Sequence, residues 1–429
     1  MTYDEAVDYL YNATPQFQRI GAAAYKPGLE TVTRLAEAFG MPCQKYPTIH
    51  VGGTNGKGST AHTLAAILQS AGYKVGLYTS PHLVDFRERM RVNGAMIPRE
   101  EVVGFVERYL ESGLASSLRP SFFELTTVMA FDWFCRSGVD VAVIEVGLGG
   151  RLDSTNIITP VLSVITNISL DHMAQLGDTP EQIATEKAGI IKPGVTLVCG
   201  EEDESIRRIF AGRAAAMGSQ AVFAALDYDS LVFRHDGDRL VVDGTPAGSL
   251  RFALTGECQK QNSRTIVAAV ECLRSQGWAI SDEAVAKGFD GVCDLTGLMG
   301  RWMTVGRQPL TICDTGHNIG GWELLSKQLM ELPRPLTVVL GFVNDKDTSH
   351  IFPLLPRDAS YIFTNASIPR ALPASELAAR AAEAGISGEI VDSVAAAFGK
   401  AREMTPAKGS VFIGGSTFVV ADLLASMQD

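Results

Sequence analysis

The sequence lacks the features of several classes of protein. No apolar run approaches the roughly 20 residues that a membrane-spanning helix needs. The first five residues show neither the basic start nor the apolar stretch of a secretory signal peptide. The seven cysteines include no C-x-x-C pair, so the sequence indicates neither a structural zinc site nor a disulfide framework. We therefore expect a cytoplasmic protein with reduced thiols.

Positive charge is also scarce. The 37 Lys and Arg residues are outnumbered by 48 Asp and Glu residues, which gives a formal net charge of -11. A surface of this sign does not attract nucleic acid or anionic membranes, so we expect neither as a partner. Any anionic ligand must then be held by local groups. The length of 429 residues and the apolar content of 46% allow two or three domains with large cores.

The most informative segment is a glycine-rich stretch between a strand-like run, residues 48–51, and a helical run that continues to residue 68. It reads Gly52-Gly53-Thr54-Asn55-Gly56-Lys57-Gly58-Ser59-Thr60. A glycine turn of this kind lets backbone N–H groups surround phosphate oxygens, and the start of the helix adds partial positive charge. The segment therefore predicts nucleotide binding.

The side chains of this segment suit the same ligand. Lys57 provides a cation for the outer phosphates, and Ser59 or Thr60 provides a hydroxyl for a metal or a phosphate oxygen. The strict P-loop pattern would place glycine at Val51 and Ser or Thr at Gly58, so this is a variant loop. The alternative is a surface glycine turn without a ligand.

Apolar runs of strand length alternate with helical stretches along most of the chain. Continuous apolar strands are typical of a parallel sheet that is covered on both faces. Residues 226–254 instead show short alternating runs, which predict antiparallel strands. The other predicted strands cover residues 75–79, 139–146, 161–168 and 195–199, and the predicted helices cover residues 122–136, 179–191 and 262–276.

A second domain is indicated after residue 297. The glycine-rich stretch 288–301 is typical of a domain junction. Beyond it, predicted strands alternate with helices again, at residues 310–313, 336–340, 361–363 and 411–413. The predicted fold is therefore α/β. A P-loop ATPase domain with a mostly parallel sheet covers residues 1–297, and a smaller Rossmann-like domain covers residues 298–429.

Polar residues stand at the ends of three predicted strands, where ligands gather in parallel sheets. Ser80 ends the first, Glu145 ends the second and is followed by glycines, and His172 follows the third. Next to a phosphate loop, such a Glu and His predict a Mg²⁺ site, because Mg²⁺ takes few protein ligands while it bridges phosphates. The alternatives are a solvated carboxylate and a structural histidine.

The ordered motifs resemble the folylpolyglutamate synthase/dihydrofolate synthase family, a branch of the Mur-ligase superfamily. They lie at residues 53–59, 79–82, 145–156, 170–172, 176–179 and 186–194. The resemblance implies a monomeric, ATP-dependent carboxylate–amine ligase that forms ADP. Its substrates would be L-glutamate with dihydropteroate and reduced folates, joined through an acyl phosphate. The alternatives are a folylpolyglutamate synthase only, another Mur-type amino-acid ligase, and a nucleotide-switch module without ligase activity.

The resemblance also implies roles for single residues. The catalytic residues would be Lys57, His172 and Lys187, the last carrying a carbamate. The implied ATP contacts are Gly53, Thr54, Asn55, Gly56, Lys57, Gly58, Ser59, Asn262, Arg301, Asp314 and His317. The implied Mg²⁺ ligands are Ser59, Ser80, Glu145 and His172. The implied pterin contacts are Phe122, Phe123, Leu152, Asp153 and Ser154, with residues 22–30 as a loop over them.

Two of these roles have plain structural alternatives. Lys187 could be an ordinary helix-surface lysine that pairs with Glu186 or Asp178, and Phe122 or Phe123 could belong to the core. The chain also departs from the family pattern at two places. It has Asp-Thr-Gly-His-Asn-Ile at residues 314–319 where the family often has Asp-Gly-Ala-His-Asn-Pro, and Cys258 where many members have His. Neither departure removes a reacting group.

The phosphate loop generates the first prediction. Lys57→Ala is expected to abolish ATP turnover and to leave the fold intact, because the lysine is a ligand contact on a turn. Phosphate release measures the turnover, and circular dichroism measures the fold. Phosphate release at the unsubstituted rate from the Lys57→Ala protein would contradict the nucleotide assignment.

Overall fold

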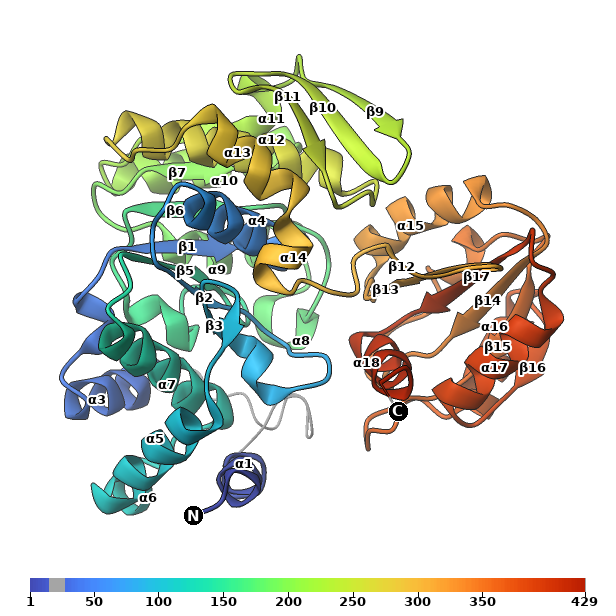
Figure 1. The fold of residues 1–429 in the computed structure, drawn as a ribbon, viewed down its shortest axis with the longest axis horizontal. Coiled ribbons are helices and arrows are strands. Elements are labelled where there is room, and N and C mark those ends of the chain that lie inside the picture. The colour runs from blue at the N-terminus through green and yellow to red at the C-terminus, as the bar shows by residue number, and fades with distance from the viewer. Residues whose placement is uncertain (15–27, 429) are drawn as a thin grey trace. The chain divides into compact units, whose positions relative to one another are not determined.

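The computed structural model describes residues 1–14 and 28–428. The predicted loop at residues 22–30 therefore lies largely outside the described residues. The chain divides into two compact units (Figure 1). The first unit comprises Met1–Ala253 and Gln259–Leu298, and the second comprises Leu254–Cys258 and Met299–Asp429. None of the helices in the described part of the chain has the length and apolar character needed to cross a membrane.

The first unit is built on an eight-stranded sheet whose six strands from β2 to β8 run parallel. The short strands β3 and β4 add to the β2 edge in antiparallel pairing. In spatial order the strands are β4 (Ala95–Met96), β3 (Met90–Val92), β2 (Val75–Tyr78), β5 (Val141–Glu145), β1 (Thr48–Gly52), β6 (Leu162–Ile165), β7 (Leu197–Cys199) and β8 (Ala221–Phe223). The predicted strands and their parallel pairing are confirmed, because continuous apolar runs need cover on both faces.

Helices cover both faces of this sheet (Figure 1). On one face, α4 (Lys57–Ser70) contacts α12 (Gln259–Ser275), α13 (Asp282–Asp290) and α14 (Val292–Thr296). On the other, α7 (Phe122–Ser137) packs with α1 (Tyr3–Asn12), α3 (Glu30–Ala38) and α5 (Arg99–Glu111). The described residues of this unit also form the helices α6 (Leu114–Ser117), α8 (Met173–Leu176), α9 (Pro180–Lys187), α10 (Glu204–Ala216) and α11 (Ala224–Asp227), with 3-10 turns at Pro42–Gln44, Phe86–Arg89, Ser154–Ile157 and Ala188–Ile190.

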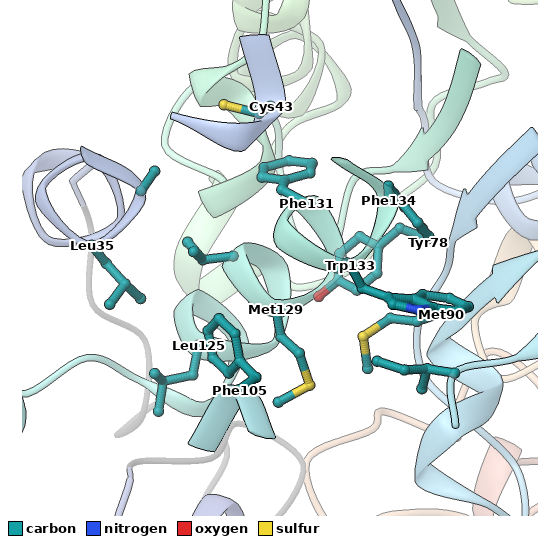
Figure 2. Close-up of a cluster of buried hydrophobic side chains, with 14 of the residues drawn as sticks. Leu35, Cys43, Tyr78, Met90, Phe105, Leu125, Met129, Phe131, Trp133 and Phe134 are labelled. Atoms are coloured by element: carbon teal, nitrogen blue, oxygen red, sulfur yellow. The ribbon is translucent and has the colours of Figure 1, made fainter. Parts of the chain in front are cut away.

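The helix α7 shows how the sequence sets an element that carries candidate site residues. Ser121 caps its start, since the Ser121 hydroxyl accepts from Glu124 N at 3.3 Å and the Glu124 carboxylate accepts from Ser121 N at 2.7 Å. Such a reciprocal cap satisfies two backbone donors that the helix itself cannot bond. Its apolar side chains then fill a core with β2, α3 and α5 (Figure 2). This burial fixes the helix start beside the sheet.

A small antiparallel sheet completes the first unit. It consists of β9 (Val232–Asp236), β10 (Arg239–Thr245) and β11 (Gly248–Phe252), with β10 in the middle. The prediction of antiparallel strands within residues 226–254 is confirmed.

The second unit has a six-stranded sheet in the order β12 (Met303–Arg307), β13 (Leu310–Asp314), β17 (Ser410–Gly414), β14 (Leu336–Leu340), β15 (Ser360–Phe363) and β16 (Gly388–Ile390). Only β12 pairs in antiparallel fashion. Its helices are α15 (Ile319–Glu331), α16 (Ala374–Glu383), α17 (Val394–Met404) and α18 (Thr417–Ser426), with a 3-10 turn at Phe352–Leu354. The α/β fold prediction, with two largely parallel sheets, is confirmed.

The segment Leu254–Cys258 belongs to the second unit although its neighbours in sequence belong to the first. Two hydrogen bonds hold it against α15. The Gln328 side chain accepts from Glu257 N at 2.8 Å and donates to the Thr255 carbonyl at 3.3 Å. The local sequence pattern did not predict that this segment belongs to the second unit.

Helix packing in the first unit generates a stability prediction. A Cβ at Gly288 in α13 would lie 2.6 Å from the Ile67 backbone in α4, so Gly288→Ala must push two helices apart. We expect it to destabilise the protein by about 1–3 kcal/mol and to lower the thermal midpoint in calorimetry. Gly212→Ala in α10 is the matched control. Its added Cβ meets nothing within 4 Å, so better helix propensity should stabilise by about 0.5–1 kcal/mol. Equal effects of the two substitutions would contradict the packing argument.

Candidate functional site

The phosphate loop connects the end of β1 to the start of α4 and can only be built with glycine at two points. Gly53 has φ +133° and Gly56 has φ +82°. A Cβ at Gly53 would lie 1.9 Å from Thr166 Oγ1, and one at Gly56 would lie 2.2 Å from Asn262 Oδ1. No side chain caps the start of α4, so the N–H groups of its first turn are placed to bind an anion.

Residues after β6 brace this loop, although no sequence motif pointed to them. Asn167 accepts from Thr54 N through its carbonyl at 2.8 Å and from Asn55 N through its side chain at 3.0 Å. The Thr166 hydroxyl donates to the Asn55 carbonyl at 2.6 Å. The loop backbone is therefore held in place by the neighbouring strand, which is the pre-organisation that phosphate binding requires.

Two lysines converge on one carbonyl oxygen of the loop. Lys187 Nζ lies 2.8 Å and Lys57 Nζ lies 3.1 Å from the Gly53 oxygen, and Lys57 also donates to the Thr54 carbonyl at 2.9 Å. Lys187 is 4% exposed, and Glu186 pairs with Arg151 instead. The helix-surface alternative for Lys187 is therefore wrong. Burial, followed by the charge of Lys57, lowers the pKa of Lys187 to about 7.

The predicted metal ligands gather partly at the carboxyl edge of the sheet. Glu145 ends β5 beside Val51 of β1 and is buried, and its carboxylate accepts from Ser80 N at 2.9 Å. Ser59 lies buried in the first turn of α4. His172 precedes α8 with a left-handed backbone, φ +50°. Of these four residues, Ser80 and Glu145 are joined directly by that hydrogen bond.

Phe122 and Phe123 open α7, yet they differ in what they can offer a ligand. The Phe122 ring is 3% exposed; Tyr11 stacks on it at 5.4 Å and the Arg89 guanidinium lies 5.1 Å from its centre. This arrangement favours the core alternative for Phe122. Phe123 is only partly buried and its ring lies over Gly147, where a Cβ would come within 2.3 Å of the ring. Phe123 is the better placed of the two for an aromatic ligand.

Asp153 lies in the loop after β5 together with Leu152 and Ser154, which are partly exposed. The Asp153 carboxylate is buried and accepts from Leu148 N at 2.7 Å and from Thr155 N at 3.0 Å. Burial raises the pKa of Asp153, and its hydrogen-bond donors act in the opposite direction. Its oxygens thus serve the loop itself, and a direct pterin contact from Asp153 stays a prediction.

The remaining candidates lie on two parts of the chain. Asn262 in α12 stands against Gly56 of the phosphate loop. In the second unit, Asp314 at the end of β13 accepts from Trp302 N and Gly316 N, each at 2.7 Å. The Arg301 guanidinium donates to the Thr315 hydroxyl, and His317 Nδ1 lies 3.1 Å from the Thr315 carbonyl. The loop after β13 therefore brings together Arg301, Asp314 and His317.

Comparison with known proteins places the chain in a family. Residues 51–270 match the Mur ligase middle domain, and residues 300–417 match the Mur ligase glutamate ligase domain. A dihydrofolate synthase/folylpolyglutamate synthase of Bacillus subtilis is 35% identical over 374 residues, which cover 82% of this chain and 84% of that protein. The chain belongs to the folylpolyglutamate synthase/dihydrofolate synthase family. The predicted family is confirmed.

Solved structures of this family share the fold. The structure of Escherichia coli FolC in complex with DHPP and ADP has 29% identity and a TM-score of 0.85, and covers 100% of this chain and 98% of that chain. Mycobacterium tuberculosis folylpolyglutamate synthase complexed with ADP has 28% identity and a TM-score of 0.87, with coverage of 99% and 98%.

The first relatives found are longer than this chain. A probable bifunctional folylpolyglutamate synthase/dihydropteroate synthase of Haloferax volcanii is 34% identical over 433 residues. The match covers 98% of this chain and 50% of that protein, so the chain spans about half the length of this relative.

The buried amine generates the prediction for this site. The neutral amine is the form that reacts with CO₂, and a pKa of about 7 makes it the main form of Lys187 above pH 7. At fixed dissolved CO₂, carbamylation should therefore increase between about pH 6 and pH 8, whereas an ordinary lysine stays charged there. Carbon NMR with ¹³CO₂ measures the carbamate signal.

Two variants test the assignment of that signal. Lys187→Ala should remove the signal and most ligase activity, and the exposed Lys74→Ala should change neither. An unsubstituted protein without a carbamate signal, together with an active Lys187→Ala variant, would contradict the prediction.

Proposed function

We propose that the chain is an ATP-dependent carboxylate–amine ligase that adds L-glutamate to dihydropteroate and to reduced folates. The observation that carries this proposal is the braced phosphate loop with two lysines on the Gly53 carbonyl, close in the sheet to Glu145. Family membership adds support. The relatives include enzymes named for both activities, from Bacillus subtilis and Escherichia coli.

The reaction would take two steps. The substrate carboxylate attacks the γ-phosphate of ATP, which gives an acyl phosphate and ADP. The amine of glutamate then attacks the acyl carbon and phosphate leaves. The first step is needed because a free carboxylate has no viable leaving group. Lys57 and the N–H groups at the start of α4 are placed to offset the charge of the transferring phosphoryl group.

A divalent cation fits the residues present. The buried Glu145 carboxylate receives one N–H bond from Ser80, and a buried carboxylate favours a cation beside it. When bound, Mg²⁺ would be held by Ser59, Ser80, Glu145 and His172 and would neutralise phosphate charge. In the described residues no three His, Cys, Asp or Glu form a metal cluster, as expected for a set with two hydroxyls. One related structure contains Mn, AMPPNP and L-glutamate.

Lys187 has a role in this proposal as a carbamate. The neutral amine that its burial produces would capture CO₂ and become an anionic oxygen ligand next to Lys57 and the phosphate loop. That change would place a negative charge beside the ammonium group of Lys57, which attracts it. His172 would face the same edge of the sheet as a further catalytic group.

The two units divide the work in this proposal. Residues 1–297 form the ATPase domain, and residues 298–429 form the domain that serves glutamate. The proposed ATP-binding residues outside the phosphate loop are Asn262, Arg301, Asp314 and His317. Phe123, with Leu152, Asp153 and Ser154, forms the pterin side. We further propose a cytoplasmic monomer without nucleic-acid or membrane partners.

A phosphate-release assay tests the function. Purified protein with ATP and Mg²⁺ is expected to release phosphate only when L-glutamate and either dihydropteroate or a tetrahydrofolate are both present. Release with tetrahydrofolate but never with dihydropteroate would restrict the activity to folylpolyglutamate synthesis. Phosphate release that depends on neither dihydropteroate nor tetrahydrofolate and requires another carboxylate would indicate a different Mur-type ligase. Phosphate release without any acceptor would indicate a nucleotide switch.

A further inference from the structure

A line of hydrogen bonds connects the strand before the phosphate loop to the loop after β5, and the proposed function uses only its last member, Asp153. His50 lies on β1 with no exposed surface. Its Nε2 is 2.9 Å from the Thr155 hydroxyl, and that hydroxyl is 2.5 Å from Asp153 Oδ1. Three polar side chains in a buried line need a defined order of protons, because an unmatched donor or acceptor is costly there.

The order of the protons follows from the chemistry of each group. Each oxygen of the Asp153 carboxylate faces a backbone N–H, from Leu148 or from Thr155, so the ionised, accepting form suits the loop. The Thr155 hydroxyl has one proton and donates it in a hydrogen bond to Asp153. Its oxygen must then accept from His50. His50 is therefore the neutral tautomer that is protonated on Nε2.

The other ring nitrogen agrees with this order. His50 Nδ1 is buried and has no hydrogen-bond partner within the described part of the chain. A proton on Nδ1 would place a charged donor there without an acceptor, and burial lowers the pKa of His50 to about 3. The imidazole is thus a fixed donor to Thr155 at neutral pH.

The far end of this line holds the loop that borders the site. Asp153 Oδ2 accepts from Leu148 N and closes the turn between them. Gly147, one residue earlier, lies directly under the Phe123 ring, and a Cβ on Gly150 would lie 3.0 Å from the Lys187 backbone. This turn is therefore wedged between the aromatic ring and the helix that carries the buried lysine. A change in the Asp153 carboxylate would move the backbone against Phe123.

We propose that His50 and Thr155 are positioning residues which orient the Asp153 carboxylate, hold the turn of Gly147–Gly150 against Phe123, and so set the affinity for the pteroate substrate. This inference rests on the proposed function. Neither residue touches the reacting atoms in this assignment. Their effect should therefore appear in the KM for the pteroate rather than in the KM for ATP.

Three substitutions test the proposal in the full-length protein. Thr155→Val keeps the shape and removes the hydroxyl, and it is expected to raise the KM for dihydropteroate about tenfold with the KM for ATP unchanged. Thr155→Ser restores the hydroxyl and should stay near the unsubstituted value. His50→Leu should raise the same KM. Combining it with Thr155→Val should add little, because Thr155→Val already removes the hydroxyl to which His50 donates. A pteroate KM unchanged by Thr155→Val, or equal rises for ATP and pteroate, would overturn the proposal.

A measurement on the unsubstituted protein covers the case in which the variants do not fold. Histidine labelled with ¹⁵N, examined in long-range ¹⁵N–¹H spectra, should show His50 with a protonated Nε2 and a bare Nδ1 at neutral pH. The opposite tautomer or a doubly protonated ring would overturn the proposal. If the unsubstituted protein shows no pteroate-dependent phosphate release, the proposed function fails, and the tautomer result still decides the hydrogen-bond order.

Discussion

The carbonyl oxygen of Gly53 is the point on which the site depends. Two lysine side chains reach it, Lys57 from the start of α4 and Lys187 from the end of α9. Burial lowers the pKa of Lys187, and the charge of Lys57 at the same acceptor lowers it further. Burial and this neighbouring charge together favour a neutral amine beside the phosphate loop. Carbamate chemistry at Lys187 would be a consequence of where the backbone of β1 ends.

Close backbone approach is the second feature that shapes the site. Gly53 and Gly56 fit against Thr166 and Asn262, and Gly147 fits under the Phe123 ring. Each contact joins segments far apart in the chain, and each would be broken by a side chain. The first unit therefore positions its polar groups by packing backbone against neighbouring strands and helices. In the second unit, a side chain holds the backbone instead. The Asp314 carboxylate accepts two backbone N–H groups and so closes the loop in which it lies.

The buried line of hydrogen bonds from His50 through Thr155 to Asp153 is a third feature that shapes the site. The oxygens of the buried Asp153 carboxylate accept hydrogen bonds from the loop after β5. Thr155 also donates to Asp153 and itself accepts from His50, which lies on the strand that ends at the phosphate loop. One strand thereby connects the phosphate loop with the loop that carries Asp153. A buried line of hydrogen bonds of this kind favours one arrangement, since a shift would leave further polar groups without partners.

The sequence by itself determined the parts that depend on local pattern. Continuous apolar runs identified β2, β5, β6 and β7 as parallel strands, and the glycine-rich segment with Lys57 identified the phosphate loop. Both could be predicted because strand burial and loop geometry depend on residues that are neighbours in the sequence. Only the tertiary structure decided that Lys187 is buried, that Phe122 lies in the core, that Thr166 and Asn167 brace the loop, and that Leu254–Cys258 joins the second unit. Burial and pairing between distant segments set these properties, and no local spacing encodes them.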